Sequence, residues 1–571
     1  GTSSYRYSRP YPSKNYLCSE RRKGRVLNKM LIQEHILKSA AYLLIALLFA
    51  KGTHESATLL FGKENEGSVP HFVVNGLSFY LALQLIFSEF KIMMQRNKLP
   101  KGYLGWPMSE TLRWIIGNNN MKLSKEKVRQ YGDTFMTSIF FSPVVIFTTD
   151  EDVTWLWNTQ RKNLTTGSWP DHWKMLLGRG SVPVASGKYH RMLRRALEPA
   201  FAPASVKDYL PRLDSILQEE LQKIAASTTS NENFLSSFVR FKVVAMKLLL
   251  GSIFEQVDDA GVERVSHDFA IWSRGFAAIV PFEIPGLAMG RGMAARRRIL
   301  SYCRELVENF QQKEKLQNGE QTSSSTLLGR IMSAIDDDGK PLSLEILSNN
   351  ILVMLFAGHD TTANSMGTIL HFLHVYPEVQ DALREEAKTF TEPVTFDQLR
   401  DAPVLNAFLQ ETLRIVPPVG FAFVETKQDL PYKDYTIPKG MKMGYNILLG
   451  GHNEKHYPNP TEFRIERFLP DDHPFVVKKK EAGESMIKRS TTNYDEGLYK
   501  SSFRIFGGGN HSCLGAQFAK LETRLFLVRI LQRYNLDVGE SKLRFFPFHA
   551  YHVNFRLQKR DEEEAKHQSV A

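Results

Sequence analysis

Cys513 lies in a glycine-rich segment, Phe503–Ala519, whose composition could support chemistry. Three consecutive glycines, Gly507–Gly509, precede it and predict a tight turn, because glycine favours neither helix nor strand. After the cysteine, apolar residues recur at helical spacing: Leu514, Phe518, Leu521, Leu525 and Phe526. Cys513 is therefore expected where a helix begins, and the N–H groups and dipole there favour a thiolate. Gly515 leaves room beside the first turn for a large, flat group.

Several kinds of site could use one cysteine in such a loop. A lone cysteine is often only a small buried hydrophobe. The glycines match neither G-x-G-x-x-G nor a loop ending in G-K-[ST], which argues against phosphate binding. Zinc needs three or four ligands, and no second cysteine lies nearby. A nucleophile with His511 as its base would need side chains close in sequence to point at each other. The pattern best suits the single axial cysteine ligand of a haem iron.

Phe506-x-x-Gly509-x-His511-x-Cys513-x-Gly515 resembles the haem-binding signature of the cytochromes P-450, the haem-thiolate monooxygenases. The resemblance implies heme b as the cofactor, Cys513 as the ligand of its iron, and the other four residues in haem binding. The family usually has arginine where this chain has His511. A neutral histidine can still donate one hydrogen bond to a haem propionate but carries no charge. Sterol 14-demethylases also have histidine there.

A long helix is predicted from Ser343 to about Tyr376, where Pro377 stops it. The segment Ala357-Gly-His-Asp-Thr-Thr362 interrupts its apolar face with small and polar residues. Glycine within a helix costs about 0.5–1 kcal/mol relative to alanine, and such departures from local rules mark working sites. The segment resembles the acid–threonine groove of the family, in which dioxygen is activated. The resemblance implies that Thr361 donates a catalytic hydrogen bond and that Asp360 supports proton delivery.

Two further motifs resemble supporting sites of the family. His190 and Arg194, four residues apart, share a helix face, and the resemblance implies that they reach a haem propionate. Glu411 and Arg414, three apart before Pro417-Pro418, also share a helix face. In the family such a pair is buried and closes a network with a later arginine, for which Arg467 is the candidate here. This network is expected to be structural, because removing one member leaves a buried charge unpaired.

Composition describes a well-cored protein and excludes some classes. The 571 residues are 43% hydrophobic and 11% aromatic, enough for one catalytic domain and an appendage. Three widely spaced cysteines form no disulfide framework, which fits a reducing compartment. The net charge of +12 comes without a nucleic-acid motif, so we expect no nucleic-acid partner, and a lipid or acidic-protein partner instead.

The first 97 residues predict a basic tail followed by membrane-anchoring segments. Residues 1–30 carry eight Lys and Arg residues against one Glu, and the apolar runs 36–50 and 72–87 follow. Each run is shorter than the ~20 apolar residues of a comfortable span, and basic residues flank both. We therefore expect one transmembrane helix and an interfacial one. The expected location is the endoplasmic reticulum membrane, with a plastid or other organelle membrane as the alternative.

The expected fold is mainly α with smaller β-sheets, an α+β cytochrome P-450 fold with a long central helix over the haem. The catalytic domain is expected at 98–560 and a charged tail at 561–571. A hairpin is predicted at 137–149, with its turn at Ser142-Pro143. Residues 205–320 are predicted to be helical except for an aromatic-rich break, and 471–502 to be a charged insertion near the proximal face. The aromatic stripe, which could line an access channel or only pack the core, contains Phe269, Trp272, Phe276, Ile279, Phe282 and Ile284.

The resulting interpretation is a membrane-bound monooxygenase that inserts one atom of O2 into an apolar substrate. No flavin-binding or Rossmann fingerprint is present, so electrons must come from an NADPH-cytochrome reductase or a ferredoxin. The Pro285-Gly286 step followed by Ala294-Ala-Arg-Arg-Arg298 resembles the access-channel region of retinoid, abscisate, brassinosteroid and triterpenoid hydroxylases. This resemblance suggests an isoprenoid substrate (retinoid, carotenoid, sterol or triterpenoid). The alternatives are a haem-thiolate isomerase or dehydratase like allene oxide synthases, which lack the acid–threonine pair, and a non-catalytic haem sensor. The expected docking face for the electron donor comprises Lys188, Arg191, Arg195, Lys520 and Arg524.

Overall fold

A computed structural model describes residues 99–102, 113, 120–139, 142–228, 234–254, 259–276, 278, 282–316, 326–484, 503–544 and 548–560. The segments expected to anchor the chain, the tail at 561–571 and residues 485–502 of the expected insertion lie outside these ranges. Within the described part, no helix combines the length and apolar character needed to cross a bilayer.

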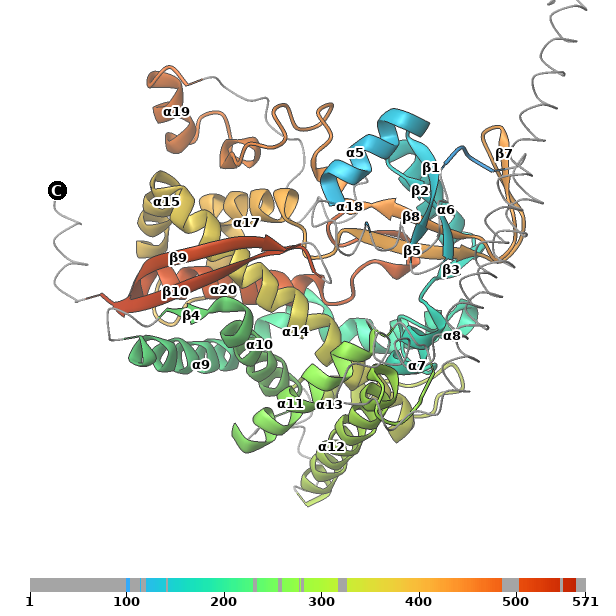
Figure 1. Ribbon diagram of the computed structural model, residues 1–571. Coiled ribbons are helices and arrows are strands. Elements are labelled where there is room, and N and C mark those ends of the chain that lie inside the picture. The colour runs from blue at the N-terminus through green and yellow to red at the C-terminus, as the bar shows by residue number, and fades with distance from the viewer. Residues whose placement is uncertain are drawn as a thin grey trace, which may run out of the picture.

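Helices dominate the described chain, as the sequence predicts (Figure 1). In the first half they are α5 (Asn120–Tyr131), α6 (Asp150–Arg161), α7 (Asp171–Leu177), α8 (Gly187–Leu197), α9 (Pro203–Ser227), α10 (Ser237–Ile253), α11 (Asp259–Phe276), α12 (Ala288–Leu316) and α13 (Leu327–Met332). In the second half they are α14 (Leu344–Val375), α15 (Pro377–Lys388), α16 (Phe396–Asp401), α17 (Pro403–Ile415), α18 (Ile447–Gly451), α19 (Pro474–Glu481) and α20 (Ala516–Arg533). Short 3-10 turns are η3 (Glu198–Phe201), η4 (Ile465–Phe468) and η6 (Gly509–His511).

In the part of the chain that the structure describes, three small sheets accompany the helices. The five-stranded sheet has the order β1 (Thr134–Ile139), β2 (Ser142–Phe147), β8 (Lys442–Asn446), β5 (Phe421–Thr426) and β3 (Thr165–Gly167). The three-stranded sheet has the order β4 (Leu235–Ser236), β10 (Ala550–Lys559) and β9 (Tyr534–Arg544), and β6 (Leu430–Tyr432) pairs with β7 (Tyr435–Ile437). The described residues of the predicted helical stretch 205–320 form α9, α10, α11 and α12, and the predicted break falls between α11 and α12. Strand β4 is a second interruption that the sequence did not predict.

The predicted hairpin exists, but its turn was misplaced. Strands β1 and β2 are antiparallel, and Pro143 lies within β2 opposite Ser138. Pairing of β2 with β8 begins only at Val144. Proline is tolerated near the start of a strand, where its missing N–H interrupts little of the ladder. Ser142 and Pro143 are therefore paired strand residues and do not form the turn.

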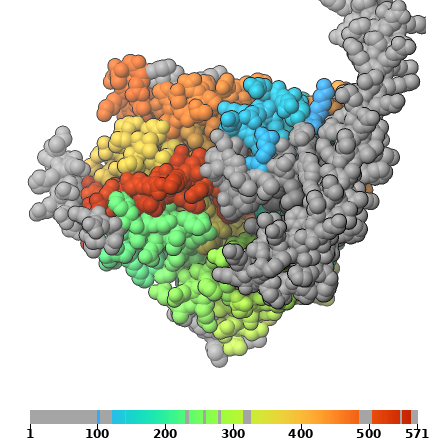
Figure 2. All heavy atoms as spheres, viewed as in Figure 1, coloured from blue at the N-terminus to red at the C-terminus, as the bar shows by residue number. Residues whose placement is uncertain are grey.

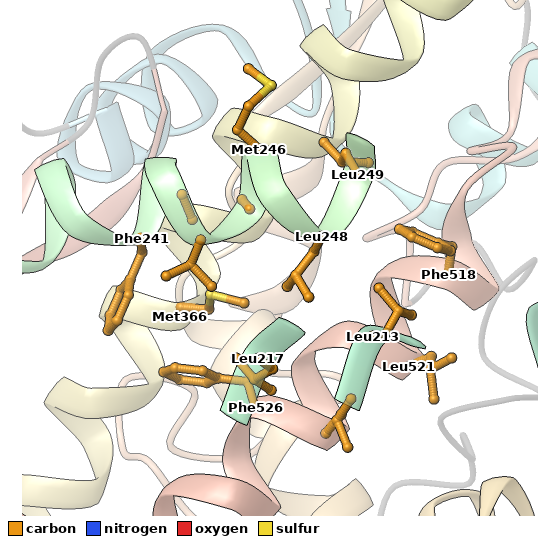
Figure 3. Packing of buried hydrophobic residues seen from close by; sticks show 14 of the residues in the cluster. Leu213, Leu217, Phe241, Met246, Leu248, Leu249, Met366, Phe518, Leu521 and Phe526 are labelled. Carbon is orange, nitrogen blue, oxygen red and sulfur yellow. The ribbon is translucent and has the colours of Figure 1, made fainter. Parts of the chain in front are cut away.

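Helix α14 runs through the largest hydrophobic cluster and ends where the sequence predicts. Ser343 caps its first turn by accepting a hydrogen bond from the N–H of Ile346, and Pro377 opens the next helix. Helices α10 and α20 pack directly on α14, and α9 packs on α10 and α20. Figure 3 shows apolar side chains of α9, α10, α14 and α20 gathered between these helices. The labelled members are Leu213, Leu217, Phe241, Met246, Leu248, Leu249, Met366, Phe518, Leu521 and Phe526. This packing fixes α14 beside α20, which begins just after Cys513.

Candidate active site

The loop that carries Cys513 is closed by backbone contacts. The N–H of Cys513 donates to the carbonyl oxygen of Phe506 at 2.8 Å. Gly507 and Gly509 have φ angles of 72° and 67°, in the left-handed region that favours glycine. Helix α20 begins at Ala516, two residues later than the sequence indicates. The cysteine therefore lies just before the first turn of a helix, as expected.

Helix α6 presses against the glycines of this loop. A Cβ atom at Gly508 would lie 2.4 Å from the ring of Trp157, and one at Gly509 would lie 2.5 Å from Oε1 of Gln160. Asn510 adds a hydrogen bond from its side-chain nitrogen to the carbonyl of Gln160 at 2.7 Å. The triple glycine thus allows close packing that any side chain would prevent. The sequence does not predict a role for these two α6 residues, because nothing local links them to the loop.

The surroundings of Cys513 fit a large, flat group on its sulfur. Cys513 is accessible to water although Ser512 and Ala516 beside it are buried. A Cβ atom at Gly515 would meet no neighbouring atom within 4 Å. The depth of the site raises the pKa of the Cys513 thiol, while the N–H of Gly515 and the charge of Arg194 act to lower that pKa. A bound iron would keep this sulfur as the thiolate.

Two histidines meet beside the loop. The rings of His190, from α8, and His511 are 4.1 Å apart between centroids. Burial lowers the pKa of His190 to about 4 and that of His511 to about 3, with nearby positive groups adding to the effect. Nε2 of His190 is buried without a hydrogen-bond partner. A buried, unpaired imidazole nitrogen beside the cysteine loop fits a haem propionate as the missing partner.

Arg194 contacts the cysteine loop itself. Its guanidinium donates to the carbonyl of Ser512 at 2.7 Å, to the hydroxyl of Ser512 at 3.0 Å and to the carbonyl of Asn510 at 3.3 Å. The structure therefore brings His190 and Arg194 to the loop from one helix, as their spacing predicts. The contacts of Arg194 indicate that it braces the loop, in addition to any contact with a propionate.

The acid–threonine segment forms an accessible stretch within the otherwise buried helix α14. Ala357 is exposed and Thr361 half-buried, whereas His359 and Asp360 are buried. The Thr361 hydroxyl donates to the carbonyl of Ala357 at 2.6 Å. This return bond uses the single hydroxyl proton, so Thr361 must break it before it can donate to another acceptor. Thr362 links the segment to α20, because its hydroxyl donates to Oε2 of Glu522 at 3.0 Å.

Glu522 is a buried acid that the sequence analysis overlooked. Only 1% of its surface is exposed, and its Oε1 has no hydrogen-bond partner. Burial raises the pKa of Glu522 to about 8, and the hydrogen bond from Thr362 opposes part of that rise. Helical spacing alone could have indicated this buried acid, because Glu522 lies four residues after Phe518 and so falls on the apolar face of α20.

Glu522→Gln should stabilise the protein more in alkali than in acid. A raised pKa means that the folded state binds the proton more tightly than the unfolded state. The contribution of this protonated carboxyl to the free energy of unfolding is therefore complete below pH ~4.5 and is lost as the pH rises toward about 8. Glutamine needs no proton, so the gain in free energy of unfolding should grow over this window to roughly 2–5 kcal/mol. Thermal unfolding of the wild type and Glu522→Gln between pH 5 and 9 measures this gain, and Glu219→Gln, at an exposed position, is the control. An equal change in stability at pH 5 and at pH 9 would contradict the raised pKa of Glu522.

Glu411, Arg414 and Arg467 meet in the interior. Arg414 donates to both carboxylate oxygens of Glu411, at 2.6 and 2.7 Å, and Arg467 donates to Oε1 at 3.2 Å. All three side chains are at most 1% exposed. The remaining donors of the two arginines bond backbone carbonyls of Gly451, Pro458, Asn459, Pro460 and Glu462. The group therefore ties α17 to the segment around η4.

The described part of the aromatic stripe runs from buried positions at Phe269, Trp272 and Phe276 to half-buried positions at Phe282 and Ile284. Phe269 and Trp272 are fully buried and Phe276 nearly so, which is core packing. Around them a chain of ring contacts connects Trp173 to Phe276 at 5.0 Å and Phe276 to Phe356 at 4.7 Å. Phe356 directly precedes the exposed Ala357. Ile279 of the predicted stripe lies outside the described residues.

One sequence-based expectation about the surface is wrong. Lys520 and Arg524 were expected on an exposed basic face, but both are buried in α20, at 0% and 2% exposed. Arg524 donates to Oδ1 of Asn406 at 2.8 Å. Most of α20 lies inside the fold, including these two charged residues, whereas Arg533 in its last turn is exposed. The basic face of α8 does remain exposed, with side-chain exposures of 82% for Lys188 and 69% for Arg195.

Comparison with known proteins identifies the family. The cytochrome P450 family model matches residues 100–551. Abscisic acid 8'-hydroxylase 4 of Arabidopsis thaliana is 27% identical, over 82% of this chain and 93% of its own length. The retinoic acid-bound structure of cyanobacterial CYP120A1 has a TM-score of 0.67 at 24% identity, covering 81% of this chain and 99% of that one. The haem domain of cytochrome P450DA has a TM-score of 0.66 at 19% identity, covering 82% and 98%.

The family match spans most of the chain, and both structural neighbours share the fold. The family's cofactor is haem held by a cysteine thiolate, which agrees with the accessible Cys513 and the unpaired His190 nitrogen beside its loop. The matched range lies inside the expected domain 98–560, whose ends stay a prediction. The chain therefore belongs to the cytochrome P450 family and is a haem-thiolate monooxygenase.

Proposed function

We propose that the enzyme hydroxylates a lipophilic isoprenoid, using O2 and electrons from a separate reductase or ferredoxin. The observation that carries the proposal is the run of aromatic rings from Trp173 through Phe276 to Phe356, which ends at the accessible Ala357–Thr361 stretch. Flat aromatic walls suit ring-bearing and conjugated apolar molecules. One relative is named a hydroxylase of abscisic acid, and one structural neighbour is bound to retinoic acid, which supports an isoprenoid substrate for this enzyme.

The residues around the loop have separate tasks in this proposal. When bound, haem would supply the activation of dioxygen, and Cys513 would be the ligand of its iron. His190, Arg194 and His511 would bind its propionates, and Phe506, Gly509 and Gly515 would line its site. Asp360 and Thr361 hold and transfer protons. Because both members of this pair are present, monooxygenation is favoured over isomerisation of the allene oxide synthase type and over a sensor role.

A spectral screen of the ferric enzyme tests the substrate class. Retinoid, carotenoid, sterol and triterpenoid ligands should give a saturable shift of the haem absorption, and a straight-chain fatty acid of similar length should not. Phe356→Ala should weaken the isoprenoid response, with Phe408→Ala, buried in α17 away from this run, as the control. Product formation must then depend on NADPH and a reductase. A response to the fatty acid alone would reject the isoprenoid class, and turnover without NADPH would favour the isomerase.

Thr361→Ala should uncouple electron use from product formation. Removing a catalytic proton donor typically costs about 10²–10⁴-fold, and the diverted oxygen should accumulate as peroxide. Product and peroxide per NADPH measure the effect. Thr368→Ala is a matched control, because its hydroxyl makes the same kind of bond to the carbonyl four residues earlier, at 3.0 Å. Wild-type coupling in Thr361→Ala would remove Thr361 from the mechanism.

We also propose that α8 presents the docking face for the electron donor. Lys188 and Arg191 are exposed on the helix whose His190 and Arg194 reach the cysteine loop. Opposite charges steer encounter, and salt screens that steering. Lys188→Glu with Arg191→Glu should slow haem reduction and flatten its salt dependence, whereas Lys207→Glu on α9 should not. An unchanged rate and salt slope would place the docking face elsewhere.

Membrane attachment through residues 1–97 is part of the same proposal. The apolar runs at 36–50 and 72–87 support it, and the endoplasmic reticulum is the proposed membrane. Removing residues 1–97 should release the enzyme from alkaline-washed membranes. If the shortened chain stayed in the membrane fraction, another part of the molecule would have to hold it there.

A further inference from the structure

Asp360 is a buried carboxylate with a charged partner from another helix. It is 2% exposed on α14, and Nζ of Lys242, on α10, lies 2.7 Å from its Oδ1. Nδ1 of His359 lies 3.5 Å from the same oxygen. Neither contact meets the angles of a well-aligned hydrogen bond at Oδ1. Nothing in the sequence around Lys242 indicates such a partner.

Lys242 connects Asp360 with the surface. Its side chain is 27% exposed while that of Asp360 is 3% exposed. The ammonium group also lies 4.3 Å from the centre of the Phe238 ring, which stacks on His552 of β10 at 4.4 Å. Nε2 of His552 lies 3.3 Å from Oδ1 of Asn364. Asn364 in turn donates to the carbonyl of Asp360 at 2.7 Å.

These contacts enclose one small region between α10, α14 and β10. On the face shown in Figure 2 the C-terminal hairpin (red) lies against the segment containing α9 and α10 (green), and the two pack directly. Phe238 is 39% exposed at this junction. The region therefore reaches solvent at one end and the Asp360 carboxylate at the other.

The charges around Asp360 keep its carboxyl group ionised. Burial alone would raise the pKa of Asp360, but His359 and Lys242 together outweigh it and lower the pKa. From the sheet side, burial lowers the pKa of His552 to about 4, and the charges of Arg544 and Lys242 add to this. His552 is thus neutral near pH 7. Lys242 is then the fixed positive charge beside the carboxylate.

We propose that Lys242 is a positioning residue that holds the Asp360 carboxylate toward solvent, and that protons for the reaction enter there, between α10 and β10. The carboxylate accepts a proton from water at this junction and later releases it toward Thr361, so Asp360 itself is unchanged over one cycle. The inference rests on the proposed role of Asp360 and Thr361. The competing explanation is an ion pair that only ties α10 to α14.

The test compares Lys242→Met and Lys242→Arg in the purified holoenzyme with its reductase. Lys242→Met should raise NADPH consumed per product at least about fivefold and enlarge the solvent isotope effect, because the proton path loses its positioned acceptor. Arginine keeps the charge and should restore coupling to within about twofold. Added to Asp360→Asn, Lys242→Met should cause no further loss. Lys242→Gln gives a second neutral variant in case methionine disturbs folding.

A matched control and a second readout separate the two explanations. Lys247→Met breaks a comparable ion pair on the same helix, to Glu220 at 2.6 Å, and should leave coupling unchanged. In infrared difference spectra of the ferric enzyme, the carboxyl band that Asp360→Asn removes should titrate at higher pH in Lys242→Met. Wild-type coupling in Lys242→Met, with uncoupling in Asp360→Asn, would overturn the inference and leave the proposed function standing. Unchanged coupling in both Asp360→Asn and Thr361→Ala would overturn both.

Discussion

Cys513→Ser should abolish the red-shifted absorption band of the ferrous–carbon monoxide complex and reduce turnover to background. That band arises from thiolate ligation of haem iron, and a serine hydroxyl cannot supply the electron density that favours O–O cleavage. The loop itself should survive the change. Its closing bond joins the backbone N–H of residue 513 to Phe506, and Arg194 holds the neighbouring Ser512.

Cys303→Ser provides a matched control for the ligand. Cys303 is 1% exposed, and burial raises the pKa of its thiol to about 12, so it is an inert core residue. Its replacement should cost some stability and leave the carbon monoxide band intact. Spectra of dithionite-reduced, carbon monoxide-treated protein distinguish the two variants. If the band persisted in Cys513→Ser, another residue would have to ligate the iron.

Features encoded by short stretches of chain were predictable from the sequence. The cap at Ser343 and the stop at Pro377 define α14, and local turn chemistry defines the loop before α20. The pairing of Glu411 with Arg414 follows from their spacing on one helix. In each case the deciding interaction lies within a few residues, so the sequence contains all its parts.

Features that depend on distant packing were not predictable. Whether Lys520 faces solvent depends on what surrounds α20, and helical spacing alone gives no answer. The contact between Lys242 and Asp360 joins residues 118 positions apart, and the packing of Trp157 on Gly508 joins two distant segments. The pairing of β2 with β8, from Val144 to Phe147, likewise joins segments far apart in the sequence.

Breaking the buried network at Arg414 should destabilise the fold without changing the chemistry. Arg414→Met leaves Glu411 with one arginine partner in an interior that is almost fully enclosed. It also removes the donors to the carbonyls of Gly451, Pro460 and Glu462. Losing one member of a buried charged group typically costs about 3–5 kcal/mol, mostly because the remaining charge stays buried. The variant should therefore unfold at much lower denaturant and lose haem early.

Two measurements test this prediction: the free energy of unfolding, and the amount of product formed per NADPH consumed. Denaturant unfolding, followed by haem absorption, should show the loss in both Arg414→Met and Glu411→Gln, while product per NADPH in the folded fraction stays at the wild-type value. Thr361→Ala should give the opposite result, with normal unfolding and poor coupling. Arg400→Met, which disrupts only exposed pairs with Asp397 and Asp401, should unfold like the wild type. Wild-type stability in Arg414→Met would show that the network does not support the fold, and uncoupling in its folded fraction would assign it a role in the reaction.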